Sequence, residues 1–275
     1  MGERTIKAMG WNVRQGGFLT DGYEEPFPPR EENIRRVISE ANADALGLVD
    51  LFRWNKYYGG NEGIARFLGT RAAFYTALDD ERLTRQHPSG ADLGVVFATN
   101  EPVALSEPID LETRQGNRTV LNIGTHGLQF ATLYLDEKYE DIRMHQMLAA
   151  EAQLEDIPTI IWTDLNALRP LDTARLSEKA RSAMLRIATC ILPSSMPSVA
   201  AIQEMERREA LKVLIDKGFT DVDPKQRPTA LGNTRIFGVD YIMSRGEGME
   251  VSNFATLPHQ GGSDHLAVSA TVKVS

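Results

Sequence analysis

Short apolar runs alternate along this chain with segments whose apolar positions recur every three or four residues, a pattern typical of strands separated by amphipathic helices. Apolar runs predict strands at residues 5–11, 44–49, 72–77, 93–98, 119–124, 128–135, 159–162, 219–222, 235–243, 249–257 and 265–274. Helical spacing predicts a first helix from residue 28, and further helices at 64–68, 139–154, 177–187 and 198–217. The apolar face of the first helix is expected to consist of Ile34, Val37, Ile38 and Ala41.

Mixed strands with helices between them favour an α/β (α+β) four-layer sandwich, in which two packed mixed or antiparallel sheets are flanked by helices. The alternative is a doubly wound nucleotide-binding fold. It would need a glycine-rich phosphate loop after the first strand, and Gln15-Gly16-Gly17 does not supply one. No repeat or linker divides the sequence, so we expect a single domain over 1–275. A helix-rich insertion at about 172–217 is expected to be a lid, a specificity wall or a surface excursion.

The composition, 42% apolar and 25% charged, is that of an ordinary soluble globular protein. The N-terminus lacks the apolar core of a signal peptide, and no apolar stretch approaches the roughly 18 residues that span a bilayer. We therefore expect a cytoplasmic protein without membrane contact, and the sequence indicates no protein partner. The net charge is −8 and the basic residues are scattered, which makes a duplex DNA substrate less favoured without excluding it.

Polar residues sit within or directly after apolar strands in short patches at residues 9–12, 46–50, 160–167, 237–242 and 261–268. The patches contain aspartates, asparagines and one histidine: Asn12, Asp50, Asp164, Asn166, Asp240, Asp264 and His265. A buried carboxylate is costly unless it is paired, hydrogen-bonded or bound to a metal, and converging carboxylates need a cation or a proton between them. Because these ligands are mostly hard oxygens, the set suits Mg²⁺ or Mn²⁺ rather than zinc.

In order and spacing, these patches resemble the endonuclease/exonuclease/phosphatase superfamily, and the similarity extends over residues 11–272. The matching segments are Trp11-Asn12, Asp164-Leu165-Asn166, Val239-Asp240-Tyr241-Ile242 and Ser263-Asp264-His265-Leu266. The resemblance implies a metal-dependent hydrolase of phosphate esters, acting by in-line attack of water on phosphorus. A phosphodiesterase, a phosphatase and a nuclease all remain open, and so do small-molecule and nucleic-acid substrates.

The resemblance also implies roles at the metal and at the attacking water. Asn12 and Asp50 would lie at the metal ion, and Asp264 would help to bind the metal or the water. Asp164 would orient or deprotonate the attacking water. Asn166 would hold that water or a phosphate oxygen.

For the phosphoryl group, the resemblance implies that His265 hydrogen-bonds the phosphoryl oxygen while Asp240 orients the imidazole and favours its protonated form. Further contacts with the substrate are expected from Tyr134, Arg143, Trp54 and Arg118.

Two positions depart from the superfamily pattern. Val49-Asp50 stands where relatives have Gln-Glu, and the shorter Asp50 reaches a metal only with a shift of about an ångström or a bridging water, since Mg²⁺ demands near-ideal geometry. Tyr134 stands where relatives commonly have a histidine, and its hydroxyl is neutral. His126 is not a substitute, because it lies in the preceding hairpin turn. These departures motivate an alternative: a weakened or inactive member that binds a phosphate ligand or a protein.

Overall fold

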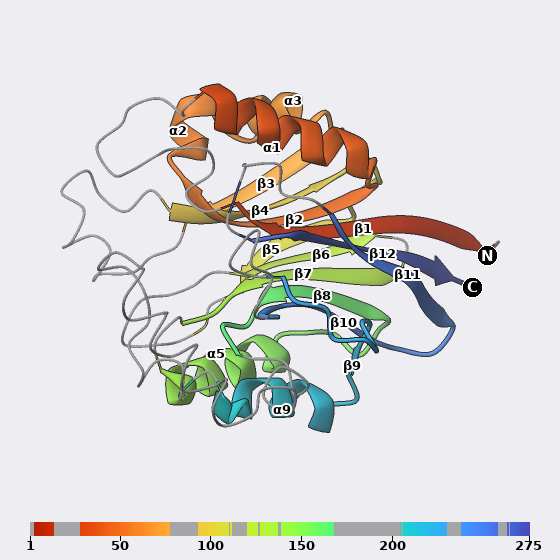
Figure 1. Ribbon diagram of the computed structural model, residues 1–275. Helices are drawn as coiled ribbons and strands as arrows, with labels where there is room; N and C mark the ends of the chain where they lie inside the picture. Colours follow the sequence, from red (N-terminus) through yellow and green to blue (C-terminus); the bar gives the residue numbers. More distant parts are fainter. Residues whose placement is uncertain are drawn as a thin grey trace.

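The strands of this protein form two six-stranded sheets that stack face to face between two layers of helices (Figure 1). The computed structural model describes residues 3–13, 28–77, 93–109, 111, 120–125, 127–136, 139–167, 204, 206–229, 238–257, 263 and 265–275. Both sheets are mixed, because β1 pairs in parallel with β2, and β7 with β8, while the other pairs are antiparallel. The predicted four-layer sandwich is confirmed.

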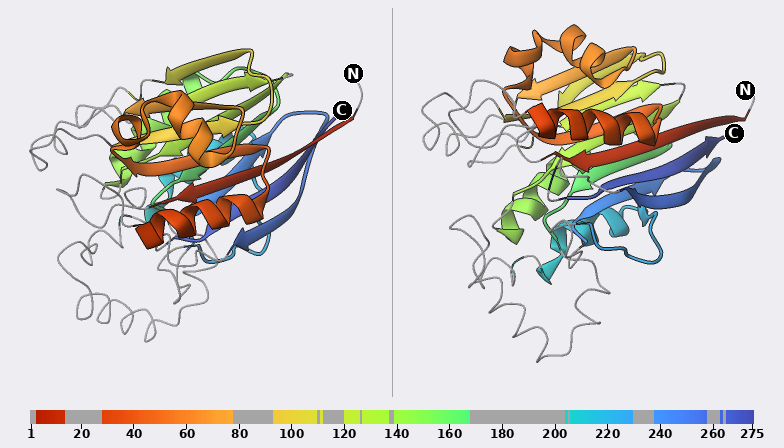
Figure 2. Two further views of the ribbon diagram at one scale, coloured as in Figure 1. Left: turned by 90° about the horizontal axis from the view of Figure 1, so that it is seen from above. Right: turned by 45° about the horizontal axis from the view of Figure 1, so that its top comes forward.

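The first sheet has the strand order β11-β12-β1-β2-β4-β3. Its strands are β1 (Arg4–Asn12), β2 (Ala45–Phe52), β3 (Ala72–Ala77), β4 (Leu93–Thr99), β11 (Met249–Leu257) and β12 (Ala267–Val274). Its outer face carries the helices α1 (Pro28–Ala41), α2 (Trp54–Tyr58) and α3 (Asn61–Leu68). Strand β1 lies at the centre of this sheet and runs antiparallel to its neighbour β12, which brings the two ends of the chain together (Figure 2).

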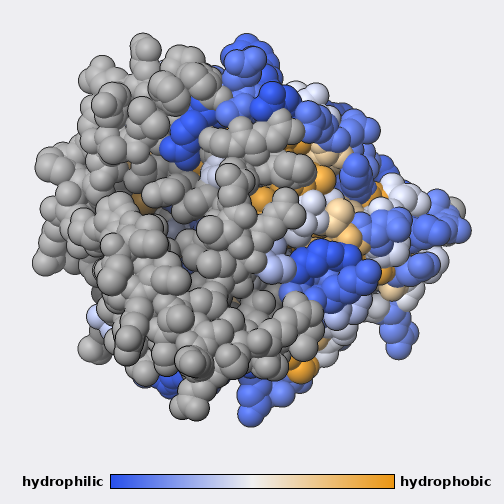
Figure 3. All heavy atoms as spheres, viewed as in Figure 1, coloured by the Kyte–Doolittle hydropathy of each residue, from blue (hydrophilic) through white to orange (hydrophobic). Residues whose placement is uncertain are grey.

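The second sheet has the strand order β5-β6-β7-β8-β10-β9. Its strands are β5 (Leu105–Ile109), β6 (Val120–Thr125), β7 (Leu128–Tyr134), β8 (Thr159–Asp164), β9 (Thr220–Asp221) and β10 (Asp240–Arg245). The helices α5 (Glu140–Ala152) and α9 (Glu209–Asp216) cover its outer face. The described residues on the side seen in Figure 3 are mainly hydrophilic, with hydrophobic residues showing only in small areas.

Three apolar clusters separate the four layers, and each follows from the alternation of side chains along the strands. The expected face of α1 is confirmed, since Ile34, Val37, Ile38 and Ala41 all pack in the cluster that joins the helices to the first sheet. A second cluster fills the space between the sheets, and a third joins the second sheet to α5 and α9.

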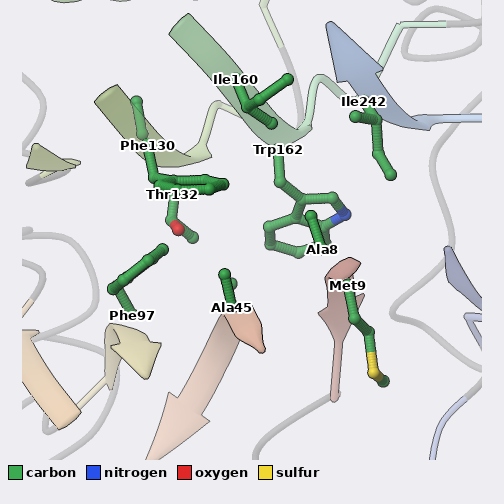
Figure 4. Close-up of a pocket in the computed structure, with 11 residues that line it drawn as sticks. Ala8, Met9, Ala45, Phe97, Phe130, Thr132, Ile160, Trp162 and Ile242 are labelled. Atoms are coloured by element: carbon green, nitrogen blue, oxygen red, sulfur yellow. The ribbon is translucent and has the colours of Figure 1, made fainter. Parts of the chain in front are cut away.

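The core between the sheets is built around Trp162 of β8 (Figure 4). The indole ring lies so close to β1 that a Cβ atom added at Gly10 would be 1.6 Å from the Trp162 Cδ1 atom. A side chain at Gly10 therefore cannot coexist with this ring in its present position. Among the described residues, the buried Nε1 donor of Trp162 has no hydrogen-bond partner.

The structure adds elements that the apolar pattern did not predict, namely β5 and α2. Most of the predicted insertion at 172–217 lies outside the described residues. Its end is confirmed as helical by α9, and its role stays a prediction. Within the described part of the chain, no helix is both long and apolar enough to cross a membrane.

Candidate active site

The candidate site lies at one end of the sandwich, on the faces of the two sheets that look toward each other. On β1, Asn12 continues the row of Ile6 and Ala8, which belong to the core between the sheets. On β8, Asp164 continues the row of Ile160 and Trp162 in the same core. Because side chains alternate between the two faces of a strand, Asn12 and Asp164 project from the same faces as these apolar residues. The polar groups thus lie at the ends of the apolar rows.

Strand register brings two further side chains into one row with Asp164 on the second sheet. Asp240 is the antiparallel partner of Asp164, and Tyr134 is its parallel partner on the other side. Register partners on neighbouring strands project from the same face of a sheet. Two aspartates and a tyrosine that are far apart in the sequence are thus neighbours.

Asp164 is almost fully buried, and two donors hold its carboxylate. Asn12 Nδ2 donates to Asp164 Oδ2 at 2.9 Å, and the backbone N–H of Asn166 donates to Oδ1 at 3.0 Å. Burial is the largest influence on this group. Together with the charge of Asp240, it raises the pKa of Asp164 to about 6, against the opposing effects of His265, Asn12 and Asn166. The carboxylate is accordingly fixed in place in an environment that disfavours its charge.

Asp240 orients His265. Its Oδ2 atom lies 2.9 Å from His265 Nδ1, so that a proton on Nδ1 is donated to the carboxylate. Asp240 is fully buried, whereas the imidazole is partly exposed. This is the pairing that the resemblance implied. It leaves Nε2 as the ring atom not used by the aspartate.

The segment that carries His265 is tied to the end of β1 by contacts that the sequence did not predict. Ser263 Oγ donates to the Asn12 carbonyl at 2.7 Å and accepts from the His265 N–H at 3.1 Å. Trp11 Nε1 donates to the His265 carbonyl at 2.9 Å. Because Ser263 and Trp11 lie within the polar patches at residues 261–268 and 9–12, their positions were visible in the sequence, but their hydrogen-bond partners were not.

Asn166 joins the ends of two neighbouring strands. It has the left-handed backbone conformation, with φ 49°, and its Nδ2 donates to the Leu135 carbonyl just after β7 at 3.1 Å. A primary amide has a second N–H donor and a carbonyl acceptor. The implied role toward water or phosphate therefore stays a prediction that the geometry allows.

Asp50 lies in a β-bulge of β2. The pairing of β2 with β4 shifts register between Leu48 and Leu51, and Asp50 has a φ of 59°. Bulges re-aim side chains and are common beside active sites. The bulge begins at Val49, the register partner of Asn12, so the Asp50 backbone lies beside the end of β1. Two other predicted site residues, Asp264 and Arg118, lie outside the described residues.

The structure contradicts the predicted substrate contact of Arg143. This side chain is fully buried, and its guanidinium donates to Glu140 Oε2 at 2.5 Å, to the Asp136 carbonyl at 3.1 Å and to the Glu204 carbonyl at 2.7 Å. Arg143 therefore has a structural role, because its guanidinium is buried and bonded to other groups of the protein. The position of Arg143 near the start of a helix suggested a phosphate contact. The sequence did not reveal that Glu140, one helical turn away, is buried and pairs with it.

Trp54 is likewise not a residue that lines the substrate. Its side chain is fully buried and packs edge-on against Tyr58 and Phe67, with ring centroids 5.2 Å apart in both pairs. It fills the core between the first sheet and its helices.

The residues at the site fit a cation. Asp164, Asp240 and His265 each offer a ligand atom, and these atoms lie within 4.8 Å of one another. The two aspartates are buried side by side, where like charges repel and water cannot screen them. A bound cation would offset that charge, and carboxylate oxygens are the ligands that hard divalent ions prefer.

Known structures share this fold. An endonuclease/exonuclease/phosphatase from Beutenbergia cavernae is 16% identical with a TM-score of 0.67, the alignment covering 99% of this chain and 72% of that one. A protein of the same description from Bacteroides vulgatus is 13% identical with a TM-score of 0.63, covering 99% and 100%. ANGEL2, a 2′,3′-cyclic phosphatase in complex with adenosine-2′,3′-vanadate, is 14% identical with a TM-score of 0.62, covering 99% and 96%.

No family model matches the sequence. No curated protein matches it either. The similarity to known proteins is therefore one of three-dimensional structure, and the chain has the fold of the endonuclease/exonuclease/phosphatase proteins. The resemblance expected from the polar patches is confirmed at that level.

Proposed function

We propose that this protein is a metal-dependent hydrolase of phosphate esters. The observation that carries the proposal is one connected set of polar groups at the end of the sandwich. Asn12 holds Asp164, Asp164 adjoins Asp240, and Asp240 holds His265. An immobilised carboxylate beside an oriented imidazole is suited to activate water and to stabilise a phosphoryl group.

Each member of the set has a task in the proposed reaction. Asp164 accepts a hydrogen bond from the attacking water and takes up its proton, while the water oxygen bonds to phosphorus and the bond from phosphorus to the leaving ester oxygen breaks. His265, held through Nδ1, meets the phosphoryl oxygen through Nε2 and stabilises its charge. Asn166 orients the water or a phosphate oxygen with the amide atoms that Leu135 does not use, and Tyr134 offers its hydroxyl from the neighbouring strand.

Mg²⁺ or Mn²⁺ is the proposed cofactor, and Asn12, Asp50 and Asp264 would hold it. Asp164 and Asp240, which also offer ligand atoms, would supply further negative charge that favours a cation at this site. The ion would neutralise charge on the phosphoryl and leaving oxygens. Asp50 is the residue on which affinity depends most, since it replaces a longer glutamate and lies in a bulge that sets its direction.

A small phosphodiester or nucleotide ester is the proposed substrate class. The 2′,3′-cyclic phosphatase of the same fold acts on such a group, and the net charge of −8 opposes the long polyanion of duplex DNA.

The test is turnover of bis-p-nitrophenyl phosphate, p-nitrophenyl phosphate and adenosine 2′,3′-cyclic phosphate with Mg²⁺, Mn²⁺ or EDTA. Asp164→Asn should strongly lower the activity, whereas the matched control Asp216→Asn, at an exposed position of α9, should keep it. An absence of metal-dependent turnover on these esters and on nucleic acid, with no metal bound in calorimetry, would refute the proposal in favour of a binding module. Activity that appears only after Asp50→Glu would locate the weakness at the metal.

A further inference from the structure

Thr229 connects the two halves of the Asp240–His265 pair. Its side chain is fully buried, and its Oγ1 accepts from the backbone N–H groups of both Val239 and Asp240 at 3.1 Å. Its carbonyl accepts from the N–H of Leu266 at 2.6 Å. One residue therefore contacts the backbone of Asp240 and that of the residue next to His265.

The second sheet shows why the backbone N–H of Asp240 needs the Thr229 hydroxyl as an acceptor. Strand β9 is only two residues long, and it pairs with β10 at Met243 and Ser244. On the other edge, the Val239 carbonyl accepts from Leu165 N–H at 3.1 Å. The N–H of the same peptide, that of Asp240, must point the opposite way, to the edge that β9 leaves uncovered. A buried N–H there requires an acceptor, and the Thr229 hydroxyl supplies it.

The loop before Thr229 is itself braced. Asp223 is fully buried and accepts hydrogen bonds from the backbone N–H groups of Lys225 and Arg227 and from the Arg227 guanidinium. The guanidinium also stacks over the Phe254 ring, 5.1 Å from its centroid. Thr229 is thus presented by a loop with little freedom, as a positioning group must be.

We propose that Thr229 is a positioning residue, which sets the distance between Asp240 and His265 by holding the backbone of both segments. The inference rests on the proposed function for its effect on turnover. The hydrogen bond from His265 Nδ1 to Asp240 can be observed without turnover, as a downfield Nδ1 proton in the NMR spectrum of the metal-free protein. Asp240→Asn identifies this resonance by removing it.

The experiment compares Thr229→Ser, which keeps the hydroxyl, with Thr229→Val, which keeps the shape. Thr229→Ser should retain the His265 resonance and the wild-type kcat. Thr229→Val should shift or broaden the resonance and lower kcat about 100-fold with KM little changed, because a displacement of about 1 Å suffices for such a loss. Thr99→Val is the matched control. Thr99 is also fully buried and its hydroxyl also accepts a backbone N–H, from Glu101, but it lies at the other end of the first sheet. The Thr99→Val variant should be less stable than the wild type but should leave the His265 resonance and kcat unchanged.

If Thr229→Val does not fold, Thr229→Ala against Thr229→Ser isolates the same hydroxyl, and only the alanine variant should lose the resonance. The proposal is overturned if the variants without the hydroxyl keep the resonance, or if serine is as damaging as valine. A wild-type protein without turnover would refute the proposed function alone, since the resonance would still decide the role of Thr229.

Discussion

Replacing Arg143 with methionine separates a structural role of this arginine from a contact with phosphate. Methionine occupies similar space but donates no hydrogen bonds. The substitution would remove the donors to Glu140, to the Asp136 carbonyl and to the Glu204 carbonyl. Glu140, which is also fully buried, would keep the Ala210 N–H at 2.7 Å and lose its cation.

The expected loss of stability is large because both side chains of the Glu140–Arg143 ion pair are excluded from water. Removing one partner of a buried ion pair costs about 3–5 kcal/mol, against a total stability of about 5–15 kcal/mol for a folded protein. At about 2–4 °C per kcal/mol, the melting temperature should fall by about 6–20 °C. The double variant Glu140→Gln/Arg143→Met leaves no buried charge and should recover much of the loss.

The stability lost in Arg143→Met should depend on pH in a definite direction. Burial raises the pKa of Glu140 above its usual range even though Arg143 opposes the shift. A carboxyl whose pKa is raised on folding favours the folded state below its unfolded pKa, about 4.3, and this contribution is lost as the pH rises through the folded pKa. The deficit of Arg143→Met should therefore be greater at pH 8 than at pH 5, and the double variant should show no such increase.

Urea denaturation at both pH values measures these differences, with kcat and KM determined at a temperature where every variant is folded. Arg36→Met, at an exposed position of α1, is the control for the loss of an arginine as such. If Arg143→Met kept the stability of the wild type and raised KM for the ester, the assignment of Arg143 to the fold would be wrong.

Three further predictions concern the site and its support. Asp164→Asn should lower kcat by about 10²–10⁴-fold. Because burial raises the pKa of Asp164 to about 6, the metal-free variant should also be more stable than the metal-free wild type at pH 8 in urea denaturation, and this advantage should vanish at about pH 3, below the unfolded pKa of about 3.9. Asp240→Asn and His265→Gln should each lower kcat, and the double variant should be no worse than the more severe single one, since the two act as a unit; additive losses would contradict that pairing. Gly10→Ala should lower stability by about 1–3 kcal/mol or more, because its Cβ would meet the Trp162 ring; an unchanged melting temperature would show that the ring moves freely.

The amphipathic elements could be predicted because their signal is local. The face of α1 and the rows of β1 and β8 follow from helical and strand periodicity, which the sequence displays directly. β5 was missed for an equally local reason. It reads Leu-Ser-Glu-Pro-Ile, with Pro108 inside it, and proline is tolerated only because this strand forms an edge of its sheet.

The chemistry of the candidate site was also predictable in kind. Acidic and amide side chains at strand ends indicated a cation, and the resemblance to the superfamily implied a phosphate ester. The observed contacts of Asn12, Asp164, Asp240 and His265 are compatible with both interpretations. The roles of these residues in turnover remain predictions.

By itself, the sequence determined the alternation of strands and helices and the kinds of polar group at the strand ends. Only the tertiary structure decided which of these groups meet. Asn12 and Asp164 are 152 residues apart, Ser263 and Asn12 are 251 apart, and their contacts depend on strand register and on the packing of two sheets. The same packing enclosed Arg143, because a side chain's burial and partners are set by distant segments rather than by its own neighbours in the sequence.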